Sequence, residues 1–480
     1  MKVELAGHNV DVDLLENLQH GWADEAVITP ETISAAYARI SRDPRDITQL
    51  RAESREDIAK ARKSNETIIF GYGHGSIAEH AVFNIDVIDL SRLAIEYVQQ
   101  HRLASYTEKS QRYIKLNRDY FIPQELDTFT AQKYVDTVDS SFDLYNKIYT
   151  KLVTIFKEKG LVGTVAENKA KEDARYILPL CVYTQFGMTV NARELEHMLK
   201  NFYSSALPEL YALADNILLS VSSIAPSLIK YISPTEYSKG NEETQTLVNG
   251  ILEENNDVYL FTSSDPHVIY IPKKSDLDIE LCAVILYAHS IQSYSKCYTI
   301  AEGLPFFKQK ELVMSVFKNR KSFEAVKHYF EFVDFTFDLC ISSSSYAQLK
   351  RHRMTSQIVQ DYDAELRYTL PESFLELDGE VKEDVMEQLA AFNRLSRMLP
   401  NYAKDYAITS SHKRRVLLKI NARELYQFIS LRASHEAQWD IRNTANEIIE
   451  LVKKDAPLIA ILLCGKDNYE FEYKQLFGGN

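Results

Sequence analysis

Apolar and polar positions along the 480-residue chain follow two periods, one typical of helices and one typical of half-buried strands. Residues 30–39 and 54–67 are expected to be helical. Residues 335–339 alternate between apolar and polar side chains, and residues 82–87 form the counterpart of this strand earlier in the chain. A further apolar stripe at helical spacing near the C-terminal end is made of Ala437, Ile441, Ala445, Ile448 and Val452. The mixture predicts an α+β fold, a sheet packed with helices.

A helix is expected after the first of these strands, because apolar residues recur at helical spacing over 90–98 and Asp89 can cap the first turn. Residues 110–113, further on, are expected to be extended. Side chains alternate along an extended segment, so Ser110 and Arg112 would then share one side.

Two short motifs each occur twice, in the same order. The basic cluster QHRLAS (100–105) has a counterpart in RHRMTS (351–356), 251 positions later. NAREL (191–195) is repeated letter for letter at 421–425, 230 positions later. A basic run taken alone is usually a solvated face, but a solvated face has no reason to recur at the end of the same predicted helix. The chain is therefore interpreted as an internal duplication.

The repeated order predicts two domains of the same α+β fold, residues 1–235 and 245–480. The joint between them is expected at 232–247, a stretch that contains Pro234 and Gly240 and few apolar residues. Length alone would favour about three domains, but the repeat is the stronger observation.

Composition excludes several classes of function. A hydrophobic fraction of 45% and a charged fraction of 26% suffice for two ordinary cores. The net charge of −13 argues against a nucleic-acid surface, whereas local arginines can still hold a small anion. The five cysteines are scattered without a CxxC pair, which favours buried thiols over disulfides or a zinc site. With no apolar signal core and no membrane-length run, the expectation is a cytoplasmic protein without membrane or nucleic-acid partners.

The segment GHGSIAEH (73–80) contains two histidines, and a metal site is the first alternative to consider. A zinc-binding helix needs two histidines four positions apart with a glutamate between them. His74 and His80 are six apart, with glycines nearby, so no metal is expected. A loop and helix start that lend small polar groups to a ligand fit the segment better.

Residues 421–432 are expected to form a helix with two functional faces. At about 100° per residue, Arg423 and Gln427 lie about 40° apart on one face, and Arg432 lies about 180° from Arg423. One face could therefore serve one ligand and the opposite face another. The ordinary alternative, in which Arg423 pairs with Glu424 or another neighbour, stays open.

Taken together, these segments resemble the flavin-dependent thymidylate synthases, which carry GHxSxxEH, RHRxxSxxxxSxR, RxxLP and NxR…LRxxxxAQWxIR motifs. The matching segments are GHGSIAEH (73–80), SRLAIEYVQQHRLASYTEKSQRY (91–113), ARYILP (174–179), NAREL (191–195), RHRMTS (351–356) and NARELYQFISLRASHEAQWDIR (421–442). Enzymes of this family are homotetramers, and the resemblance implies sites that lie between subunits. They would bind FAD, dUMP and methylenetetrahydrofolate, with NADPH as reductant and no cysteine nucleophile.

The resemblance also implies residue roles. Catalytic roles fall on Ser110, Arg112 and Arg432. Substrate binding falls on Glu108, Ser110, Arg112, Arg175, Gln348, Arg351 and Arg432. Flavin binding falls on His74, Ser76, Glu79, Glu108, Arg351, His352, Arg353, Asn421, Arg423 and Gln427.

The two halves depart from the family pattern in complementary ways. Half one has lost a glutamine and two arginines that the family offers to the nucleotide from a neighbouring subunit. Tyr97, Gln100 and Phe202 stand in their places. Half two has Asp361 and Asp363 where a serine and an arginine are expected, although an insertion could place Arg367 there. Half two has also lost GHxSxxEH, of which Glu331 alone aligns. One dUMP site per chain is therefore expected, made from both halves, in a homodimer that acts as a pseudo-tetramer.

Three functions fit these observations. The first is an FAD-dependent thymidylate synthase that converts dUMP to dTMP. The second, from a different class, is a non-catalytic flavin- or nucleotide-binding homologue. The third is a related flavin-dependent methyltransferase that acts on another pyrimidine.

Overall fold

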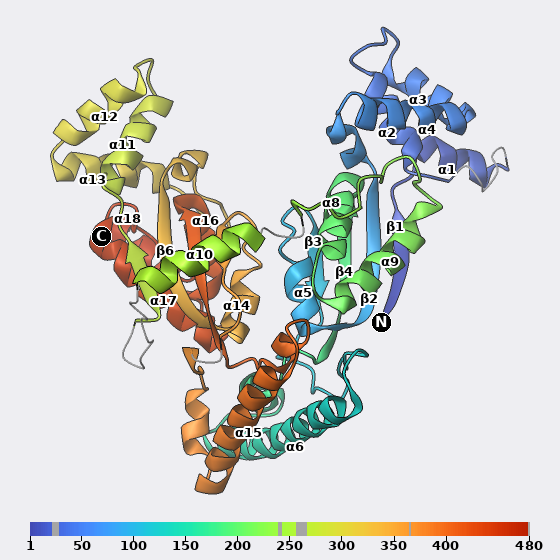
Figure 1. The fold of residues 1–480 in the computed structure, drawn as a ribbon. Coiled ribbons are helices and arrows are strands. Elements are labelled where there is room, and N and C mark those ends of the chain that lie inside the picture. Colours follow the sequence, from blue (N-terminus) through green and yellow to red (C-terminus); the bar gives the residue numbers. More distant parts are fainter. Residues whose placement is uncertain (22–27, 239–241, 256–265, 364–365, 479–480) are drawn as a thin grey trace. The chain divides into compact units, whose positions relative to one another are not determined.

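The computed structural model describes residues 1–21, 28–238, 242–255, 266–363 and 366–478 (Figure 1). The chain forms two compact units, and neither is continuous in sequence. Unit 1 consists of Met1–Asp143, Pro179–Tyr259 and Ala391–Ala407. Unit 2 consists of Leu144–Leu178, Leu260–Ala390 and Ile408–Asn480.

Unit 1 is built on a four-stranded antiparallel sheet in the order β1-β2-β4-β3 (Figure 1). The strands are β1 (Lys2–His8), β2 (Val82–Ser91), β3 (Ser105–Glu108) and β4 (Tyr183–Asn191). Phe83, Ile85 and Val87 alternate along β2 and are fully buried, as a strand with one face on a core requires. The strand predicted at 82–87 is confirmed and is four residues longer.

Helices of unit 1 cover this sheet and form a small bundle near its end. They are α1 (Val12–Gln19), α2 (Glu31–Arg39), α3 (Ile47–Glu56), α4 (Ile58–Glu66), α5 (Arg92–Val98), α8 (Ala192–Tyr203) and α9 (Pro208–Ser222). The residues of α10 (Glu242–Asn255) also belong to unit 1, but this helix is not part of that layer. Short turns are the π-helical η2 (Thr67–Gly71) and the 3-10 helix η3 (Gly75–His80). The helix predicted at 30–39 is confirmed by α2.

Unit 2 repeats the sheet in the order β5-β6-β8-β7. The strands are β5 (Val268–Ile271), β6 (Asp334–Ser342), β7 (Ser356–Val359) and β8 (Lys413–Asn421). The central pair starts in the same register in both sheets: Asn191 pairs with Val82 at the end of β4, and Asn421 pairs with Asp334 at the end of β8. The two pairs differ further along, where the register of β2 shifts between Ile88 and Leu90 and that of β6 does not. The predicted α+β fold, present twice, is confirmed.

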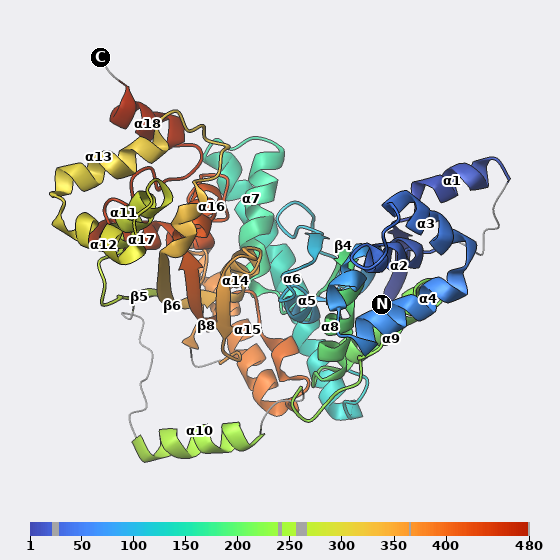
Figure 2. The same ribbon diagram turned by 90° about the horizontal axis from the view of Figure 1, so that it is seen from above.

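Helices of unit 2 include a group formed by α11 (Leu277–Ala288), α12 (Tyr294–Gly303) and α13 (Phe306–Phe317), which lie together in both views (Figures 1 and 2). The others are α7 (Thr164–Ala174), α14 (Ser343–Leu349), α16 (Ala422–Arg432), α17 (Trp439–Asp455) and α18 (Tyr469–Phe477), with the 3-10 helices η4 (Arg175–Ile177), η5 (His328–Phe332) and η7 (Glu372–Glu376). The predicted C-terminal stripe is buried; four of its members lie on α17, and Ala437 precedes that helix.

Each unit contains a segment from the other half of the sequence. The long helices α6 (Thr128–Glu158) and α15 (Gly379–Met398) each contribute residues to both units. After α6, the chain supplies α7 and η4 to unit 2; after α15, it supplies the 3-10 helix η8 (Lys404–Ala407) to unit 1. The domain boundary expected between residues 235 and 245 stays a prediction. It describes where one sequence repeat ends and the next begins, whereas the compact units exchange segments and are not separated by a single boundary in the chain.

The exchanged segments are anchored in equivalent ways. In unit 2, the hydroxyl of Tyr176 on η4 donates to Asp440 Oδ2 (3.1 Å), and Ser342 donates to the same carboxylate. In unit 1, Tyr406 on η8 donates to Glu209 Oε2 (3.0 Å), as does Ser91 (2.5 Å). Burial raises the pKa of both carboxyl groups.

Three local expectations were wrong. Residues 54–67 are not one helix, because Asp57 interrupts them and its side chain caps α4 by accepting from Lys60 N (2.9 Å). Ser91, not Asp89, caps α5, and Asp89 has a left-handed backbone with φ of 60°. Residues 110–113 form a turn and not an extended segment, because Ser110 Oγ accepts from the backbone N of Arg112 (3.2 Å).

The predicted joint also contains an element that was not expected. Helix α10 begins at Glu242, inside the 232–247 stretch, and its apolar side chains Leu247, Val248, Ile251 and Leu252 are exposed. In the part of the chain that the structure describes, no helix combines the length and the apolar character that crossing a membrane requires.

Candidate functional site

Residues predicted to bind the nucleotide gather around helix α14 in unit 2. The guanidinium of Arg175, on the exchanged η4, donates from Nη2 to Ser344 Oγ (2.9 Å). Ser344 lies one helical turn before Gln348, so both side chains share one face of α14. Arg175, Ser344 and Gln348 are all buried, with at most 8% of each exposed. The exchange of segments between units is what brings Arg175 to this helix.

Arg432 completes this group from the end of α16. Its Nη1 donates to Gln348 Oε1 (3.2 Å), and its Nε donates to His352 Nε2 (3.0 Å). His352 Nδ1 lies 2.9 Å from Glu424 Oε1. Because a guanidinium only donates, Nε2 of His352 must accept, and its proton sits on Nδ1 toward Glu424. The four side chains form one directed hydrogen-bond chain.

The histidine in this chain is held neutral. Burial lowers the pKa of His352, and the charges of Arg432 and Arg351 add to the effect, while Glu424 opposes it. A neutral imidazole can orient Arg432 as an acceptor without repelling a second cation. Arg351 and Arg353, directly beside it, are exposed at the end of α14. The geometry presents oriented guanidinium groups that suit a phosphate or another planar anion.

The predicted nucleotide residues of half one lie in unit 1. Glu108 is largely buried and accepts from Arg92 and from Gln99 Nε2 (3.2 Å). Ser110 and Arg112 lie in the turn after β3, with the Arg112 guanidinium 5.6 Å from the ring of Tyr113. Their membership of one site with Arg175 and Arg432 remains a prediction.

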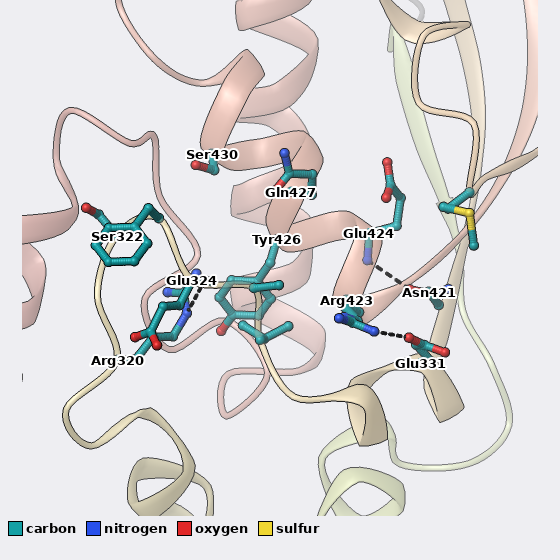
Figure 3. A pocket seen from close by; sticks show the side chains of 14 residues that line it. Arg320, Ser322, Glu324, Glu331, Asn421, Arg423, Glu424, Tyr426, Gln427 and Ser430 are labelled. Atoms are coloured by element: carbon teal, nitrogen blue, oxygen red, sulfur yellow. Dashed lines mark hydrogen bonds and ion pairs between the residues drawn. The ribbon is translucent and has the colours of Figure 1, made fainter. Parts of the chain in front are cut away.

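A pocket of about 260 Å³ in unit 2 collects the predicted flavin residues Asn421, Arg423 and Gln427 (Figure 3). Arg423 points toward Glu331 and forms an ion pair with it, and the Asn421 side chain accepts from Glu424 N (2.8 Å). Neither Arg432 nor Gln348 lines this pocket. Arg423 and Arg432 therefore have different surroundings, as the helical period predicts, and that the two faces serve two ligands stays a prediction. The partner of Arg423 is Glu331 and not Glu424.

The pocket fits part of a flavin cofactor. Asn421, Gln427, Ser322 and Ser430 offer polar groups, and Tyr426 offers a ring. The two arginines that line the pocket, Arg320 and Arg423, are accompanied by three carboxylates, those of Glu324, Glu331 and Glu424. Pockets that enclose whole drug-sized ligands have volumes of about 300–1,000 Å³, so an entire dinucleotide would extend beyond this one. The amides and hydroxyls suit the hydroxyl and ring nitrogen groups of a nucleotide, and Arg423 is already paired with Glu331.

Half one has the equivalent pair. Arg193 Nη1 lies 2.5 Å from Glu79 Oε1, as Arg423 lies beside Glu331 in unit 2. A Cβ on Gly75 would lie 3.4 Å from Arg193 Nε, so a glycine lets the loop approach this guanidinium. The geometry supports the alignment of Glu331 with Glu79. In unit 1, His74 directly precedes η3 and Ser76 lies in it. That these two residues bind one flavin together with residues of half two remains a prediction.

One residue of the group around α14, Ser344, was missed from the sequence, and its position one helical turn before Gln348 could have revealed it. The counterpart of Arg175 was missed as well. Asp405 stands 230 positions after Arg175, the same separation that relates the NAREL motifs and that relates Tyr176 to Tyr406. The equivalent of Arg175 is therefore a carboxylate.

The comparisons with known proteins agree with this description. The family model described as "Thymidylate synthase complementing protein" matches residues 25–227 and 268–458, one region in each half, which confirms the predicted tandem duplication. A flavin-dependent thymidylate synthase of Clostridium tetani is 32% identical over 212 residues, which cover 43% of this chain and 83% of the relative.

One relative matches both halves together. A UPF0159 protein of Thermoplasma acidophilum is 21% identical over 498 residues, covering 92% of this chain and 96% of that protein. Among solved structures, thymidylate synthase X from Helicobacter pylori, with FAD and dUMP, matches at 18% identity and a TM-score of 0.32 over 50% of this chain and 100% of that one.

Proposed function

The chain belongs to the flavin-dependent thymidylate synthases, the thymidylate synthase complementing protein family, as a tandem duplication, and from that premise we propose that it methylates dUMP to dTMP. Methylenetetrahydrofolate would supply the carbon and NADPH the reducing equivalents. A bound FAD would supply the redox chemistry. The task of the protein is to hold the nucleotide, orient its base and exclude water.

The observation that carries the proposal is the cluster of Arg175, Gln348 and Arg432 in unit 2. Three residues predicted from separate motifs meet at helix α14 within that unit. Arg175 donates to Ser344, and Arg432 donates to Gln348 one helical turn later. A guanidinium grips a phosphate with two parallel hydrogen bonds, and a second one can stabilise negative charge on the uracil. This polar chain has the chemistry that a pyrimidine nucleotide requires.

The cysteines support chemistry that does not use a thiol nucleophile. Four of the five are buried, and Cys464 is half-buried. Burial raises the pKa of Cys181 and Cys282 to about 12, and that of Cys464 to about 11. A thiolate is the nucleophilic form of cysteine, so these three thiols are unreactive at neutral pH.

Residues from both halves complete the proposed site. Ser110 and Arg112 of half one would contact the nucleotide together with Arg351 and the cluster of unit 2. The flavin would be held by His74, Ser76, Glu79 and Glu108 on one side and by Arg351, His352, Arg353, Asn421, Arg423 and Gln427 on the other. We propose one such nucleotide site per chain, in a homodimer that stands in for a tetramer.

The decisive experiment supplies the purified chain with dUMP, FAD, NADPH and methylenetetrahydrofolate and measures dTMP by chromatography. We expect a yellow protein, dTMP formation and NADPH oxidation that responds to dUMP, with Arg432→Phe as the inactive control. Retention of FAD and dUMP without any dTMP would identify the non-catalytic homologue instead. Methylation of another pyrimidine nucleotide, with dUMP inert, would identify the related methyltransferase.

A further inference from the structure

Three side chains with metal-binding atoms meet in unit 1. His101, Glu194 and His197 each place one donor atom within 4.8 Å of the others, and this is the only such set of three in the described residues. His101 and Glu194 are buried, and His101 Nδ1 lies 3.2 Å from Glu194 Oε1. Glu194 and His197 are three positions apart on α8, so both point from one face of that helix.

The equivalent histidine of unit 2 has a different set of neighbours. His352 Nδ1 lies beside Glu424, and its Nε2 accepts a hydrogen bond from Arg432, so a metal ion here would meet a positive charge on the same imidazole. The residue that matches His197, 230 positions on, is Gln427. Unit 2 therefore has two of the three donors and a guanidinium bonded to its imidazole.

Half one has undergone both changes that a metal site requires. Phe202 replaces the arginine, and its ring lies edge-on to His101 at 5.7 Å, so no guanidinium competes for the imidazole. His197 replaces the glutamine and adds a third donor. The rings of His101 and His197 are 5.1 Å apart. Arg193, nearby on α8, is already neutralised by Glu79.

We propose that His101, Glu194 and His197 form a binding site for Zn²⁺ or a similar divalent transition-metal ion. Two imidazoles and one carboxylate are a zinc ligand set that leaves the fourth position for water or a ligand. Tetrahedral ligands at about 2.0–2.1 Å from zinc are about 3.3 Å apart, so donors that lie up to 4.8 Å apart must close in by up to about 1.5 Å. The His197 side chain is 61% exposed, which leaves it room for that movement, and its Nε2 lies 3.2 Å from the amide nitrogen of Asn201.

The test titrates Zn²⁺ into the full chain, freed of affinity tag and treated with chelator, by isothermal calorimetry in a buffer that does not bind metals. We expect one ion per chain, and a visible absorption band of tetrahedral type when Co²⁺ is used. The variant His197→Gln, which copies the residue of half two, should weaken binding by at least about tenfold. Because His197 is exposed, this variant should keep its fold, checked by circular dichroism.

The matched control is His328→Gln, an exposed histidine of unit 2 outside any such set. It should bind Zn²⁺ like the unchanged chain. X-ray absorption of the zinc-loaded protein should show two imidazole ligands, and one after His197→Gln. Absence of stoichiometric Zn²⁺ or Co²⁺ uptake, or equal affinity in His197→Gln, overturns the proposal.

Discussion

His352 in unit 2 and His101 in unit 1 occupy equivalent positions, and each contacts a glutamate of the following NAREL motif. Their other neighbours differ. In unit 2 the imidazole orients Arg432, whereas in unit 1 it meets the ring of Phe202, which is fully buried. The same histidine–glutamate pair therefore lies beside a guanidinium in unit 2 and beside an aromatic ring in unit 1.

The difference extends to the other positions that are predicted to bind the nucleotide. Unit 2 contains Arg175, Gln348, Arg351 and Arg432, with a formal charge of +3. The equivalent positions in unit 1 are Asp405, Tyr97, Gln100 and Phe202, with a formal charge of −1. A phosphate dianion is attracted to the first set and repelled by the second. The sheet order is the same in both units, so the difference in charge comes from the side chains.

The largest effect is expected when unit 2 is given the residue of unit 1. Arg432→Phe removes charge-assisted hydrogen bonds and leaves Gln348 and His352 without their donor, so dUMP affinity should fall by about 3 kcal/mol or more. Calorimetry with dUMP measures it. Phe202→Leu, in unit 1, is the matched control and should leave affinity unchanged. An equal loss in both variants would mean that the two units bind nucleotide alike.

The proposal that one dUMP site uses residues of both halves predicts that the effects of two substitutions are not additive. Arg112→Ala and Arg432→Ala, one in each half, should each weaken dUMP binding by about 2 kcal/mol or more. The double variant should be no worse than the weaker-binding single variant, because both groups act on one ligand. Two equivalent dUMP sites per chain, or full additivity, would speak against a shared site.

A pH effect should distinguish the units. His412 is fully buried in unit 2, and burial lowers its pKa to about 3, whereas the equivalent residue of unit 1 is Val182. The unfolded chain binds this proton below about pH 6.5, so His412 should lower stability by up to about 1.4 kcal/mol per pH unit as pH falls from 6.5 toward 3.

The measurement compares urea unfolding at pH 7 and pH 5, followed by the fluorescence of Trp439 in a Trp22→Phe background. The free energy of unfolding should differ between pH 7 and pH 5, and His412→Val should make this difference smaller by about 2 kcal/mol. If the variant and the parent chain lose the same stability on acidification, the histidine does not titrate as expected.

The two segment anchors allow a finer comparison. Tyr176 donates to Asp440 and also accepts from Gln438 Nε2 (2.6 Å), whereas Tyr406 donates to Glu209. Tyr406→Phe should cost about 1 kcal/mol of stability, and Tyr176→Phe should cost more, since it also leaves the buried Gln438 amide without this acceptor. Thermal unfolding shows which variant loses more stability. A larger loss in Tyr406→Phe than in Tyr176→Phe would contradict the explanation from the two hydrogen bonds of Tyr176.

The smallest effect is expected at Asp363. It stands where half two has lost a nucleotide-binding residue, so Asp363→Ala should change dUMP affinity by no more than about 0.3 kcal/mol. Calorimetry under the conditions used for Arg432→Phe provides the comparison. A clear gain in affinity would show that this carboxylate faces the occupied site.

The amino-acid sequence determined the fold and its duplication. Alternation along β2 and β6, the apolar stripe of α17 and the two repeated motifs are local patterns, and burial of one face dictates the element that each one forms. The two faces of α16 also followed from the helical period, because Arg423 and Arg432 are fixed by one short, unbroken helix.

Only the tertiary structure decided which residues meet. The break at Asp57, the cap at Ser91 and the turn at Ser110 depend on side-chain-to-backbone hydrogen bonds that compete closely with regular structure. The exchange of η4 and η8 between units depends on contacts more than 190 positions apart, such as Tyr406 with Glu209. No local period encodes such contacts, since they arise when buried polar groups find partners across the fold.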